Sequence, residues 1–511
     1  MTDNIIVSKR NESTLLLDCE NSILRELAEN FTFFVEGYKH MPKFKAGVWN
    51  GQICLLDLRF GTLPIGLYEQ FKIEAKELGY EVEAKPNQFG SPEDTDIVTR
   101  EGLIEFTDSL NLHSNGNKIE IRDYQLDALF DCIKYQKRLI ESPTGSGKSL
   151  LIHTLMQWYR SKGFGKILLI VPTLNLLNQM KADLIDYTSE YDFNVENEIQ
   201  LMGDGASKVV TKDIVISTWQ TLIRIPADQM DFDVVIGDEI HQFKNDIMKN
   251  LFERSTSAKY KFGVSGSLGK SETNRMVLRG MIGEITKVRT TRELIDDGRL
   301  SDIKIKCVLL KYGKETKKLF KQTAIANNVS KVDYPTEVNF LCDHKKRNNF
   351  IRNLALMQKG VTLVLFNRVE DHGVPLYESI KSKSDGQEVY FISGDVNATE
   401  RERIRLVCQE SDKDVILVAS SGTTATGTNI PRINNIIFAA PTKSVIRTLQ
   451  SIGRGLRKSE GKTHLNLYDI VDVIGTGKTT SNFAYKHFTE RLSIYQSEEF
   501  DYKLLEVELE K

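Results

Sequence analysis

A glycine-rich loop between an apolar run and a helical segment constrains the fold of this chain more than any other feature. Residues 139–152 read LIESPTGSGKSLLI. The apolar run KRLIES leads into the loop, and SLLIHTLMQWYRSKG follows it with helical spacing. Such a loop leaves a strand, presents backbone N–H groups and opens a helix whose N-terminus attracts an anion. The loop predicts a nucleotide-phosphate cradle made of Pro143, Thr144, Gly145, Ser146, Gly147, Lys148 and Ser149.

A second Gly-Lys stretch, VIGTGKTTSN at residues 473–482, competes for the same interpretation. It also follows an apolar run, HLNLYDIVD, and precedes a helical segment. Its electrostatics are unfavourable, because Asp472 and the nearby Asp469 would lie where triphosphate oxygens must lie. The residues after Thr479 also contain no apolar strand that ends in Asp-Glu to hold Mg²⁺. We interpret this stretch as a glycine turn after the last strand of a sheet.

The first loop, unlike the second, is followed along the chain by an apolar strand that ends in Asp-Glu. FDVVIGDEIH is an apolar strand with Asp238 and Glu239 at its carboxyl end, the edge where open α/β sheets bind ligands. In this interpretation Lys148 contacts the β and γ phosphates, while Ser149 and Asp238 hold Mg²⁺, partly through water. Glu239 orients or deprotonates the attacking water. The alternative is an ordinary glycine turn and a strand-terminal cap, which the order and spacing of the two motifs disfavour.

Apolar runs rich in β-branched residues alternate with helical segments twice along the chain. The first series lies between about residues 120 and 290, and the second begins after about residue 340. This alternation is typical of parallel sheets covered by helices on both faces. Residues 1 to about 95 alternate short apolar runs with turns instead. The pattern predicts an α/β protein in which two tandem parallel-sheet domains follow a small α+β N-terminal domain.

The expected domain boundaries follow from these changes of pattern. We expect domains at residues 1–95, 100–300 and 301–480, and a C-terminal helix and tail at 481–511. The segment 298–331 carries one strand-like run and one lysine-rich helical run, and we expect it to bridge the two α/β units. The final DYKLLEVELEK is acidic, and we expect it to be peripheral.

Composition and apolar run length exclude several classes of protein. Lys and Arg (68) nearly balance Asp and Glu (70), so any contact with nucleic acid has to come from local patches. The six cysteines are scattered without a CxxC pair, so neither a zinc site nor a disulfide framework is expected. Apolar runs are far shorter than the roughly 20 residues of a membrane-spanning helix. The N-terminus lacks a signal-peptide pattern, so we expect a cytoplasmic protein without membrane partners.

The ordered motifs SPTGSGKS, DEIH and QSIGRGLR resemble those of the superfamily-two helicases and translocases. Members of this family hold ATP between two RecA-like domains. The resemblance therefore implies two tandem RecA-like domains and an ATP hydrolase coupled to helicase or translocase activity. RDYQLDAL looks like the family's adenine-recognition element. This implies that Gln125 reads the adenine edge, with Arg122 or Tyr124 packed nearby.

Other segments resemble the family's nucleic-acid and arginine-finger elements. VPTLNLLNQ and STWQTL are similar to first-domain elements that touch the nucleic-acid backbone, and VSGSL resembles the Ser-Ala-Thr element that couples hydrolysis to domain movement. LVASSGTTATGTNIP matches an element that contacts both ATP and the strand. Arg454 and Arg457, in QSIGRGLR, lie three residues apart on one helix face, and a guanidinium on the γ phosphate stabilises the charge of its transfer.

The resemblance extends the set of candidate site residues. It implies catalytic roles for Gln450, Arg454 and Arg457 beside Lys148, Asp238 and Glu239, and a nucleotide contact for Gly427. The residues that it implies in nucleic-acid contact are Thr173, Thr218, Trp219, Arg368, Gly394 and Thr424. Because the arginines come from the second domain, closure of the two domains would assemble the ATP site.

Within that superfamily the chain is most similar to the UvsW-type helicases of phages. FTFFVEGYKHMPKFKAGVWNGQICLLDLRFGTLPIGL, residues 31–67, resembles their small N-terminal domain, and TTRELIDDGRL and YFISGDV fall in similar places. This implies an ATP- and Mg²⁺-dependent remodeller of branched DNA or RNA–DNA hybrids in phage recombination, repair and replication. Branch migration, fork regression and loop unwinding are the implied outputs. A monomer in the host cytoplasm is expected.

The N-terminal stretch has two interpretations from its residues alone. Between Tyr38 and Gly51 it carries Lys39, Lys43 and Lys45, interleaved aromatic residues including Trp49, and no acidic residue. This mixture suits phosphate contact combined with base stacking. The alternative is a hairpin whose aromatic residues form a core and whose lysines are solvated. The family resemblance favours nucleic-acid binding.

Two other function classes are compatible with the cradle. One is an annealing or architectural DNA-binding protein in which ATP switches affinity without productive unwinding. The other is a small-molecule kinase, which the second α/β unit and its arginine pair disfavour. Strand separation that requires hydrolysis distinguishes a helicase from the first, and phosphate transfer to an acceptor other than water would reveal the second.

Overall fold

The structure is a computed structural model of the 511-residue chain. It describes residues 4–510, other than 191–192, 204, 206–208, 244, 270, 327–331, 412, 426–431, 441–451, 454, 457, 459–461, 463 and 476–481. Two compact units result: residues 1–142 with 147–289, and residues 290–511 with the loop segment 143–146. Among the helices in the described part of the chain, none is long and apolar enough to cross a membrane.

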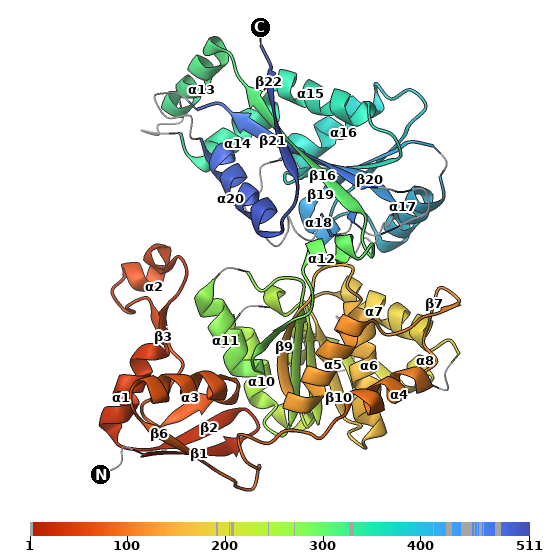
Figure 1. The fold of residues 1–511 in the computed structure, drawn as a ribbon. Coiled ribbons are helices and arrows are strands. Elements are labelled where there is room, and N and C mark those ends of the chain that lie inside the picture. The colour runs from red at the N-terminus through yellow and green to blue at the C-terminus, as the bar shows by residue number, and fades with distance from the viewer. Residues whose placement is uncertain are drawn as a thin grey trace. The chain divides into compact units, whose positions relative to one another are not determined.

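The N-terminal residues form a small α+β domain at one side of the first unit (Figure 1). Its sheet has the order β5-β2-β1-β6, in which β1 pairs antiparallel with β2 and parallel with β6. The elements are β1 (Asn4–Asn11), β2 (Thr14–Asp18), β5 (Thr62–Pro64), β6 (Glu81–Lys85) and the helices α1 (Asn21–Asn30) and α3 (Tyr68–Glu77). Alternate residues of β1, such as Ile5 and Val7, are fully buried against these helices. The expected α+β domain is confirmed.

Buried charges and a close backbone contact join this domain to the rest of the first unit. Lys137 Nζ donates to Glu12 Oε2 at 3.0 Å, and Lys9 Nζ donates to Glu12 Oε1 at 3.4 Å. Lys261, fully buried, donates to the carbonyl oxygen of Glu12 at 3.1 Å. A Cβ on Gly66 would lie only 1.9 Å from the carbonyl oxygen of Arg279 in α11 (Glu272–Ile282). Removing Glu12 would leave the buried lysine charges without their carboxylate partner, so this cluster stabilises the contact between the domain and the rest of the unit.

The first α/β sheet is parallel throughout, with the order β11-β12-β10-β13-β14-β9-β15. Its strands are β9 (Lys137–Glu141), β10 (Ile167–Val171), β11 (Ile199–Met202), β12 (Ile214–Thr218), β13 (Val234–Asp238), β14 (Tyr260–Ser265) and β15 (Ile285–Lys287). Every residue of β10, β12, β13 and β14 is buried, because helices cover both faces. The helices of this domain include α4 (Arg100–Ser109), α5 (Asp123–Tyr135), α6 (Lys148–Ser161), α7 (Leu174–Tyr187), α9 (Trp219–Leu222) and α10 (Asn245–Arg254).

The strand order places three predicted motifs next to one another. The order β13-β14-β9 makes β14 the shared neighbour of the strand that ends in Asp238 and the strand that ends in Glu141. Parallel strands end at the same edge of a sheet, so the glycine loop, the Asp-Glu pair and the segment after Ser265 meet there. Strands were expected from five apolar runs of the first series, and each run forms one: KRLIES (β9), KILLIVP (β10), DIVIST (β12), FDVVIGDE (β13) and YKFGVSG (β14). The short strands β11 and β15 were not expected, because four and three residues are too few for a periodic signal.

The second α/β sheet is also parallel, with the order β18-β19-β17-β20-β21-β16-β22. Its strands are β16 (Asp302–Lys311), β17 (Val361–Phe366), β18 (Glu388–Ile392), β19 (Val415–Ser420), β20 (Ile433–Phe438), β21 (His464–Val473) and β22 (Tyr502–Glu508). The described helices include α13 (Lys314–Ala326), α14 (Tyr334–Asp343), α15 (Lys345–Leu356), α16 (Val374–Lys381), α17 (Ala398–Glu410), α18 (Ser421–Ala425) and α20 (Phe483–Ser497). Two tandem parallel-sheet domains are confirmed.

One expectation about this unit is incomplete and another is wrong. The segment 298–331 does not act only as a bridge, because its strand β16 lies inside the sheet between β21 and β22. The segment 481–511 is not a helix followed by a tail, because it ends in strand β22, which pairs with β16. Most β22 side chains are exposed and charged residues interrupt its apolar ones, so this edge strand lacks the continuous apolar run of a buried strand.

Candidate nucleotide site and nucleic-acid interface

The glycine loop leaves β9 and ends where α6 begins at Lys148, as the sequence predicts. Gly145 and Gly147 have φ of 88° and 87°, in the left-handed region that favours glycine. A Cβ on Gly147 would lie 2.3 Å from the amide nitrogen of Gln125, so a side chain has no room there. These two glycines let the backbone curl ahead of the N-terminus of α6, which is the geometry that backbone N–H groups need to face an anion.

An ion pair joins the loop to the Asp-Glu motif. Lys148 Nζ lies 3.1 Å from Glu239 Oε1, and both side chains are 14 % exposed. Glu239 has a φ of 45°, which is uncommon for a residue with a side chain. Strained backbone of this kind persists only where the surroundings impose it, and it clusters at functional sites. The strand end of β13 therefore holds Glu239 in a special conformation against the lysine of the cradle.

The two carboxylates of this motif differ in their affinity for protons. Burial raises the pKa of Asp238, and the charge of the adjacent Glu239 raises it further. Burial alone would also raise the pKa of Glu239, but Lys148 and His241 hold it below its ordinary value. Glu239 is consequently ionised at neutral pH. A cation bound beside Asp238 would stabilise the ionised form of the Asp238 carboxylate.

The residues at this edge fit a magnesium ion that is shared with a nucleotide. Ser149 and Asp238 offer a hydroxyl and a carboxylate, the hard oxygen ligands that Mg²⁺ prefers. Within the described ranges, no group of three or more His, Cys, Asp and Glu side chains is placed to hold a metal ion. Mg²⁺ usually keeps several waters and binds through one or two carboxylates and substrate phosphates. The donor set therefore suits Mg²⁺ bound together with a triphosphate.

The predicted adenine-recognition residues lie against the loop. The side-chain amide of Gln125 donates to the carbonyl oxygen of Gly147 at 3.3 Å, and its Oε1 accepts from the backbone N–H of Arg122 at 2.9 Å. Arg122 also donates to the hydroxyl of Tyr124 at 2.6 Å. The structure thus brings Gln125 to the cradle, next to the phosphate-binding backbone. Its reading of an adenine base stays a prediction.

His241 connects the Asp-Glu motif to the segment after β14. Its Nδ1 lies 2.7 Å from the hydroxyl of Ser265 and 3.3 Å from Glu239 Oε2. Ser265 in turn donates to the carbonyl oxygen of Ser267 at 2.8 Å. The backbone N–H of Gly266 also donates to Glu239 Oε2, at 3.4 Å. The segment that resembles the family's Ser-Ala-Thr element is therefore connected to Glu239, the predicted catalytic residue, by contacts that no local motif could reveal.

A buried carboxylate lies at the start of the helix that follows the second Gly-Lys stretch. Residues 476–481 lie outside the described part of the chain, but α20 begins directly after them, and its N-terminus already holds an anion. Glu337 accepts hydrogen bonds from the backbone N–H groups of Phe483 at 2.9 Å and Ala484 at 2.6 Å, and from the side-chain amide of Asn482 at 2.8 Å. A carboxylate thus lies where a phosphate would have to bind.

The two aspartates before that stretch also have structural partners. Asp472 is fully buried and accepts from the guanidinium of Arg347 at 2.8 and 3.0 Å. Asp469, equally buried, accepts from Arg491 at 2.7 and 2.8 Å. Buried ion pairs of this quality are costly to break. Strand β21 therefore uses its aspartates to hold helices α15 and α20, which supports the interpretation that only the first loop is a cradle.

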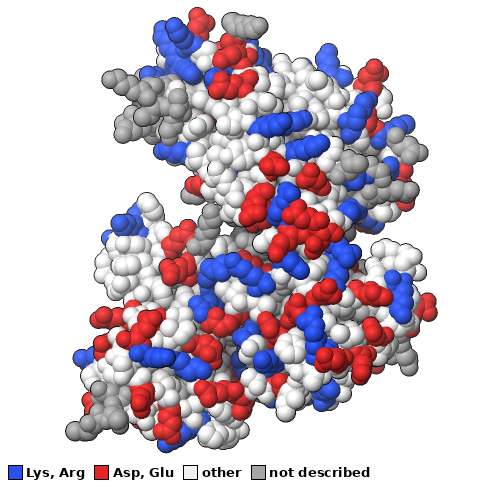
Figure 2. All heavy atoms as spheres, viewed as in Figure 1, with Lys and Arg blue, Asp and Glu red and all other residues white. Residues whose placement is uncertain are grey.

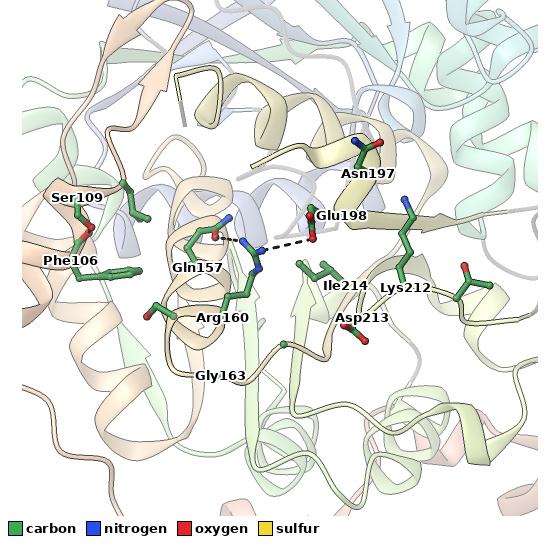
Figure 3. A pocket seen from close by; sticks show the side chains of 14 residues that line it. Phe106, Ser109, Gln157, Arg160, Gly163, Asn197, Glu198, Lys212, Asp213 and Ile214 are labelled. Carbon is green, nitrogen blue, oxygen red and sulfur yellow. Dashed lines mark hydrogen bonds and ion pairs between the residues drawn. The ribbon is translucent and has the colours of Figure 1, made fainter. Parts of the chain in front are cut away.

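A separate pocket of about 800 Å³ lies at the far end of α6 from the cradle (Figure 3). Gln157 and Arg160 line it from the last turns of α6, and Asp213 lines it from the segment before β12. Arg160 donates to Gln157 at 2.9 Å and lies 3.9 Å from Glu198. This pocket is at the amino end of the strands and contains none of the predicted site residues.

Comparisons with known proteins show the family of this chain. The family model described as "DNA helicase UvsW, N-terminal" matches residues 4–85, "Type III restriction enzyme, res subunit" matches 118–269, and "Helicase conserved C-terminal domain" matches 345–459. The ATP-dependent DNA helicase uvsW of Enterobacteria phage T4 is 33 % identical over 97 % of this chain and 98 % of its own length. The chain belongs to the UvsW family of DNA helicases.

Solved structures and a more distant relative agree with this membership. The crystal structure of T4 UvsW is 30 % identical and has a TM-score of 0.52, over 99 % of this chain and all of its own. The DNA 3'-5' translocase XPB2 of Sulfurisphaera tokodaii is 25 % identical over 44 % of this chain and 47 % of its own. Membership of the UvsW family assigns ATP hydrolysis coupled to helicase activity to this chain, and it confirms the two RecA-like domains.

Three of the residues that the family resemblance implies in contact with nucleic acid lie in the first unit, and they differ in how accessible their side chains are. Thr173 is the N-cap of α7, and its hydroxyl accepts from the N–H of Leu176 at 3.3 Å. Thr218 is 4 % exposed, and its hydroxyl lies 3.1 Å from that of Thr221. Trp219, the next residue, is half-buried at the start of α9. Their contacts with a strand stay predictions, and the buried Thr218 hydroxyl is the least accessible of the three.

The corresponding residues of the second unit fall into two groups. Arg368 is half-buried, and its guanidinium donates to Asn339 and lies 3.5 Å from Asp371. Gly394 is exposed, and Arg401 donates to its carbonyl oxygen at 2.8 Å. Outside the described residues lie Gly427, Gln450, Arg454, Arg457 and the side chain of Thr424. The roles of this second group stay predictions of the family resemblance.

The N-terminal element of the UvsW type is described in full. Between β3 (Thr32–Phe34) and β4 (Gln52–Cys54) the chain forms two short helices, η1 (Tyr38–His40) and α2 (Pro42–Lys45), which extend from the domain (Figure 1). Lys39, Lys43 and Lys45 are all exposed. Both signs of charge are otherwise intermixed over the visible face of each unit (Figure 2). This element is therefore a local basic site on a chain without a bulk positive field.

The aromatic residues of this element pack mainly against one another. Tyr38 stacks on Phe34 with ring centroids 4.8 Å apart and meets the edge of Phe44 at the same distance. The indole N–H of Trp49 donates to the carbonyl oxygen of Gln52 at 2.7 Å. Tyr38 and Phe44 thus form a small core, as one of the two interpretations of this stretch required. Phe34 remains 52 % exposed and offers a face for stacking.

Proposed function

We propose that this chain is an ATP-driven DNA helicase and translocase that remodels branched DNA. The branched substrates would include forks, four-way junctions and displacement or RNA-containing loops, and the outputs would be branch migration, fork regression and loop unwinding. The observation that carries the proposal is the UvsW match, which spans the N-terminal domain and both helicase domains. A match to the two helicase domains alone would support an ATP-driven motor without a preference for branches.

In this proposal, the glycine loop and the Asp-Glu motif bind and hydrolyse ATP. Lys148 would exchange its contact with Glu239 for the β and γ phosphates, and Ser149 and Asp238 would hold Mg²⁺. Glu239 would then be free to orient the attacking water. Arg454 and Arg457 of the second domain would stabilise the charge on the transferred phosphoryl group. Hydrolysis is thereby coupled to closing and reopening of the two domains, which moves the bound strand.

In this proposal, the N-terminal domain binds the DNA at the junction. Its basic element carries exposed lysines on a short projection, and phosphate contacts by lysines provide affinity without sequence preference. The buried cluster around Glu12 holds this domain against the first helicase domain. A duplex arm held by the element would therefore keep a constant position relative to the ATP-binding domain while the strand moves. Such a constant position is what branch migration requires.

The remaining parts of the proposal concern conditions and context. Mg²⁺ is proposed as the metal, the protein is proposed to act as a monomer on DNA or RNA–DNA hybrids, and the host cytoplasm is its proposed location. Recombination, repair and replication of phage DNA are the proposed processes. Each follows from the family resemblance together with the donor chemistry of the site.

Steady-state ATP hydrolysis at fixed moderate salt tests the proposal. The rate is measured without nucleic acid and with single-stranded, forked and four-way DNA, and strand separation is followed in parallel. We expect strong stimulation that is largest with branched DNA, and strand separation that stops when ATP is replaced by a non-hydrolysable analogue. Strand rearrangement that proceeds equally with the analogue would instead identify an ATP-switched annealing protein. Hydrolysis that is indifferent to every nucleic acid would exclude a DNA motor.

A further inference from the structure

The last residue of α7 reaches the cradle. The phenolic oxygen of Tyr187 lies 2.9 Å from the hydroxyl oxygen of Ser149, the second residue of α6. The Tyr187 ring also packs beside the ring of His153, one turn further along α6, with centroids 5.7 Å apart. Helices α6 and α7 are packed neighbours in the first unit (Figure 1). Tyr187, which is distant in sequence, therefore contacts the Ser149 hydroxyl that is proposed to bind Mg²⁺.

The position of Tyr187 is held from its other side by a hairpin. Asp186 accepts from the hydroxyl of Ser114 at 2.8 Å and from the backbone N–H of Asn115 at 2.8 Å. These residues belong to the hairpin of β7 (His113–Ser114) and β8 (Asn117–Lys118), which immediately precedes the predicted adenine-recognition element. The end of α7 is thus attached both to the adenine side and to the phosphate side of the site.

The hydroxyl chemistry of Ser149 requires such a partner when a metal is bound. A serine that ligates a cation uses a lone pair of its oxygen, and its hydrogen must then point away from the metal toward an acceptor. The phenolic oxygen of Tyr187 can accept that hydrogen at the observed distance. Partners in this outer position orient metal ligands, and their loss typically weakens metal affinity by 10- to 100-fold.

We propose that Tyr187 is a positioning residue for magnesium-bound nucleotide, which accepts the Ser149 hydrogen and turns a lone pair of Ser149 toward the metal. The inference rests on the proposed MgATP site. It assigns Tyr187 no contact with nucleotide or metal. The opposite arrangement, in which Tyr187 donates to Ser149 and competes with the metal for the same lone pair, predicts the opposite response to removal of the phenol.

The test is the variant Tyr187→Phe, which keeps the ring against His153 and removes only the hydroxyl. Equilibrium binding of a fluorescent ATP analogue is measured by titration, first in EDTA and then across a Mg²⁺ series. We expect binding in EDTA within about twofold of the wild type, and about a tenfold increase in the Mg²⁺ concentration needed for half-maximal tightening. Thermal unfolding verifies that the variant is folded. Tyr135→Phe, which removes a phenol from an exposed position on α5, is the matched control and should change neither quantity.

A double-mutant cycle completes the test. Ser149→Ala should abolish most of the tightening by Mg²⁺, and adding Tyr187→Phe to it should have no further effect if the tyrosine acts through Ser149. Equal weakening in EDTA and in Mg²⁺ would overturn the proposal in favour of a general packing role. A lower Mg²⁺ requirement in Tyr187→Phe would overturn it in favour of competition with the metal. Failure of the cradle itself would be distinguishable, because wild-type binding would then ignore Mg²⁺ and Ser149→Ala would have no effect.

Discussion

Lys148 Nζ lies 3.1 Å from Glu239 Oε1, so the lysine of the glycine loop is paired with the glutamate of the Asp-Glu motif. One residue opens α6, and the other follows the end of β13. In the proposed mechanism, a γ phosphate that binds Lys148 would replace this carboxylate, and the replacement would release Glu239 toward the attacking water. Phosphate binding and activation of Glu239 would then be one exchange of ion-pair partners.

Substitution of Lys148 should abolish ATP hydrolysis and spare DNA binding. Lys148→Ala removes the cation that contacts the phosphates, whereas the basic N-terminal element is untouched. Lys478→Ala, in the second Gly-Lys stretch, is the matched control, because Glu337 already occupies the N-terminus of the helix that follows. Steady-state hydrolysis and a DNA gel-shift assay measure the two properties. Normal hydrolysis by Lys148→Ala, or loss of nucleotide binding in Lys478→Ala, would contradict the assignment of the cradle.

Glu239→Gln should separate nucleotide binding from hydrolysis. The amide cannot take a proton from water, so we expect the hydrolysis rate to fall by about 10²- to 10⁴-fold. Nucleotide affinity should be equal to or tighter than that of the wild type, because Lys148 no longer has to leave a charged partner. Single-turnover hydrolysis and equilibrium nucleotide binding are the two measurements. Weakened binding together with slow hydrolysis would mean that Glu239 organises the site rather than acting on water.

The exposed lysines of the N-terminal element should control affinity for branched DNA. Replacing Lys39, Lys43 and Lys45 by Gln should weaken binding and reduce the slope of log affinity against log salt by up to about 3. DNA-independent hydrolysis should stay unchanged. The matched control replaces the exposed Lys314, Lys318 and Lys321 of α13, where we expect a solvated helix face. Equal losses in both variants would show a general charge effect instead of a site.

Glu337 should contribute measurably to the stability of the second unit. Its carboxylate accepts three hydrogen bonds at the start of α20, and Glu337→Gln replaces one acceptor by a donor that faces backbone N–H groups. We expect a loss of about 1–3 kcal/mol in the free energy of unfolding, the cost of leaving buried polar groups unsatisfied. Urea unfolding measures it, with the exposed Glu315→Gln of α13 as the control. A loss below about 0.5 kcal/mol would mean that water replaces the carboxylate at little cost.

The buried lysine cluster should make the first unit more stable at alkaline pH. Burial lowers the pKa of Lys137 from 10.5 to about 8, despite the favourable charge of Glu12. Between these two values the unfolded chain binds the proton and the folded chain does not, so the free energy of unfolding rises with pH through that window. The rise due to Lys137 is at most about 3 kcal/mol. Denaturant unfolding at pH 7.5, 8.5 and 9.5 measures the rise, and Lys137→Met should flatten part of it. An unchanged profile in that variant would assign the effect to Lys261, whose pKa burial also lowers.

The sequence predicted elements well where a signal is local and periodic. Strands β9, β10, β12, β13 and β14 are continuous apolar runs between helical segments, and each forms where it was expected. Strand β22 was missed because charged residues interrupt its apolar residues, so it has no such run. The aromatic residues around Tyr38 could be assigned to neither a core nor a stacking surface, because composition does not reveal which rings contact one another.

The sequence by itself determined the chemistry of this protein: a lysine and a hydroxyl in a glycine loop, an Asp-Glu pair at a strand end, and the order of motifs that marks its family. Those features depend on residues close together in the chain. Only the tertiary structure decided that His241 connects the Asp-Glu motif to Ser265, that Glu337 binds the N-terminus of the helix after the second Gly-Lys stretch, and that Tyr187 contacts Ser149. Each of these contacts joins segments that strand order and helix packing bring together, and no local pattern encodes that proximity.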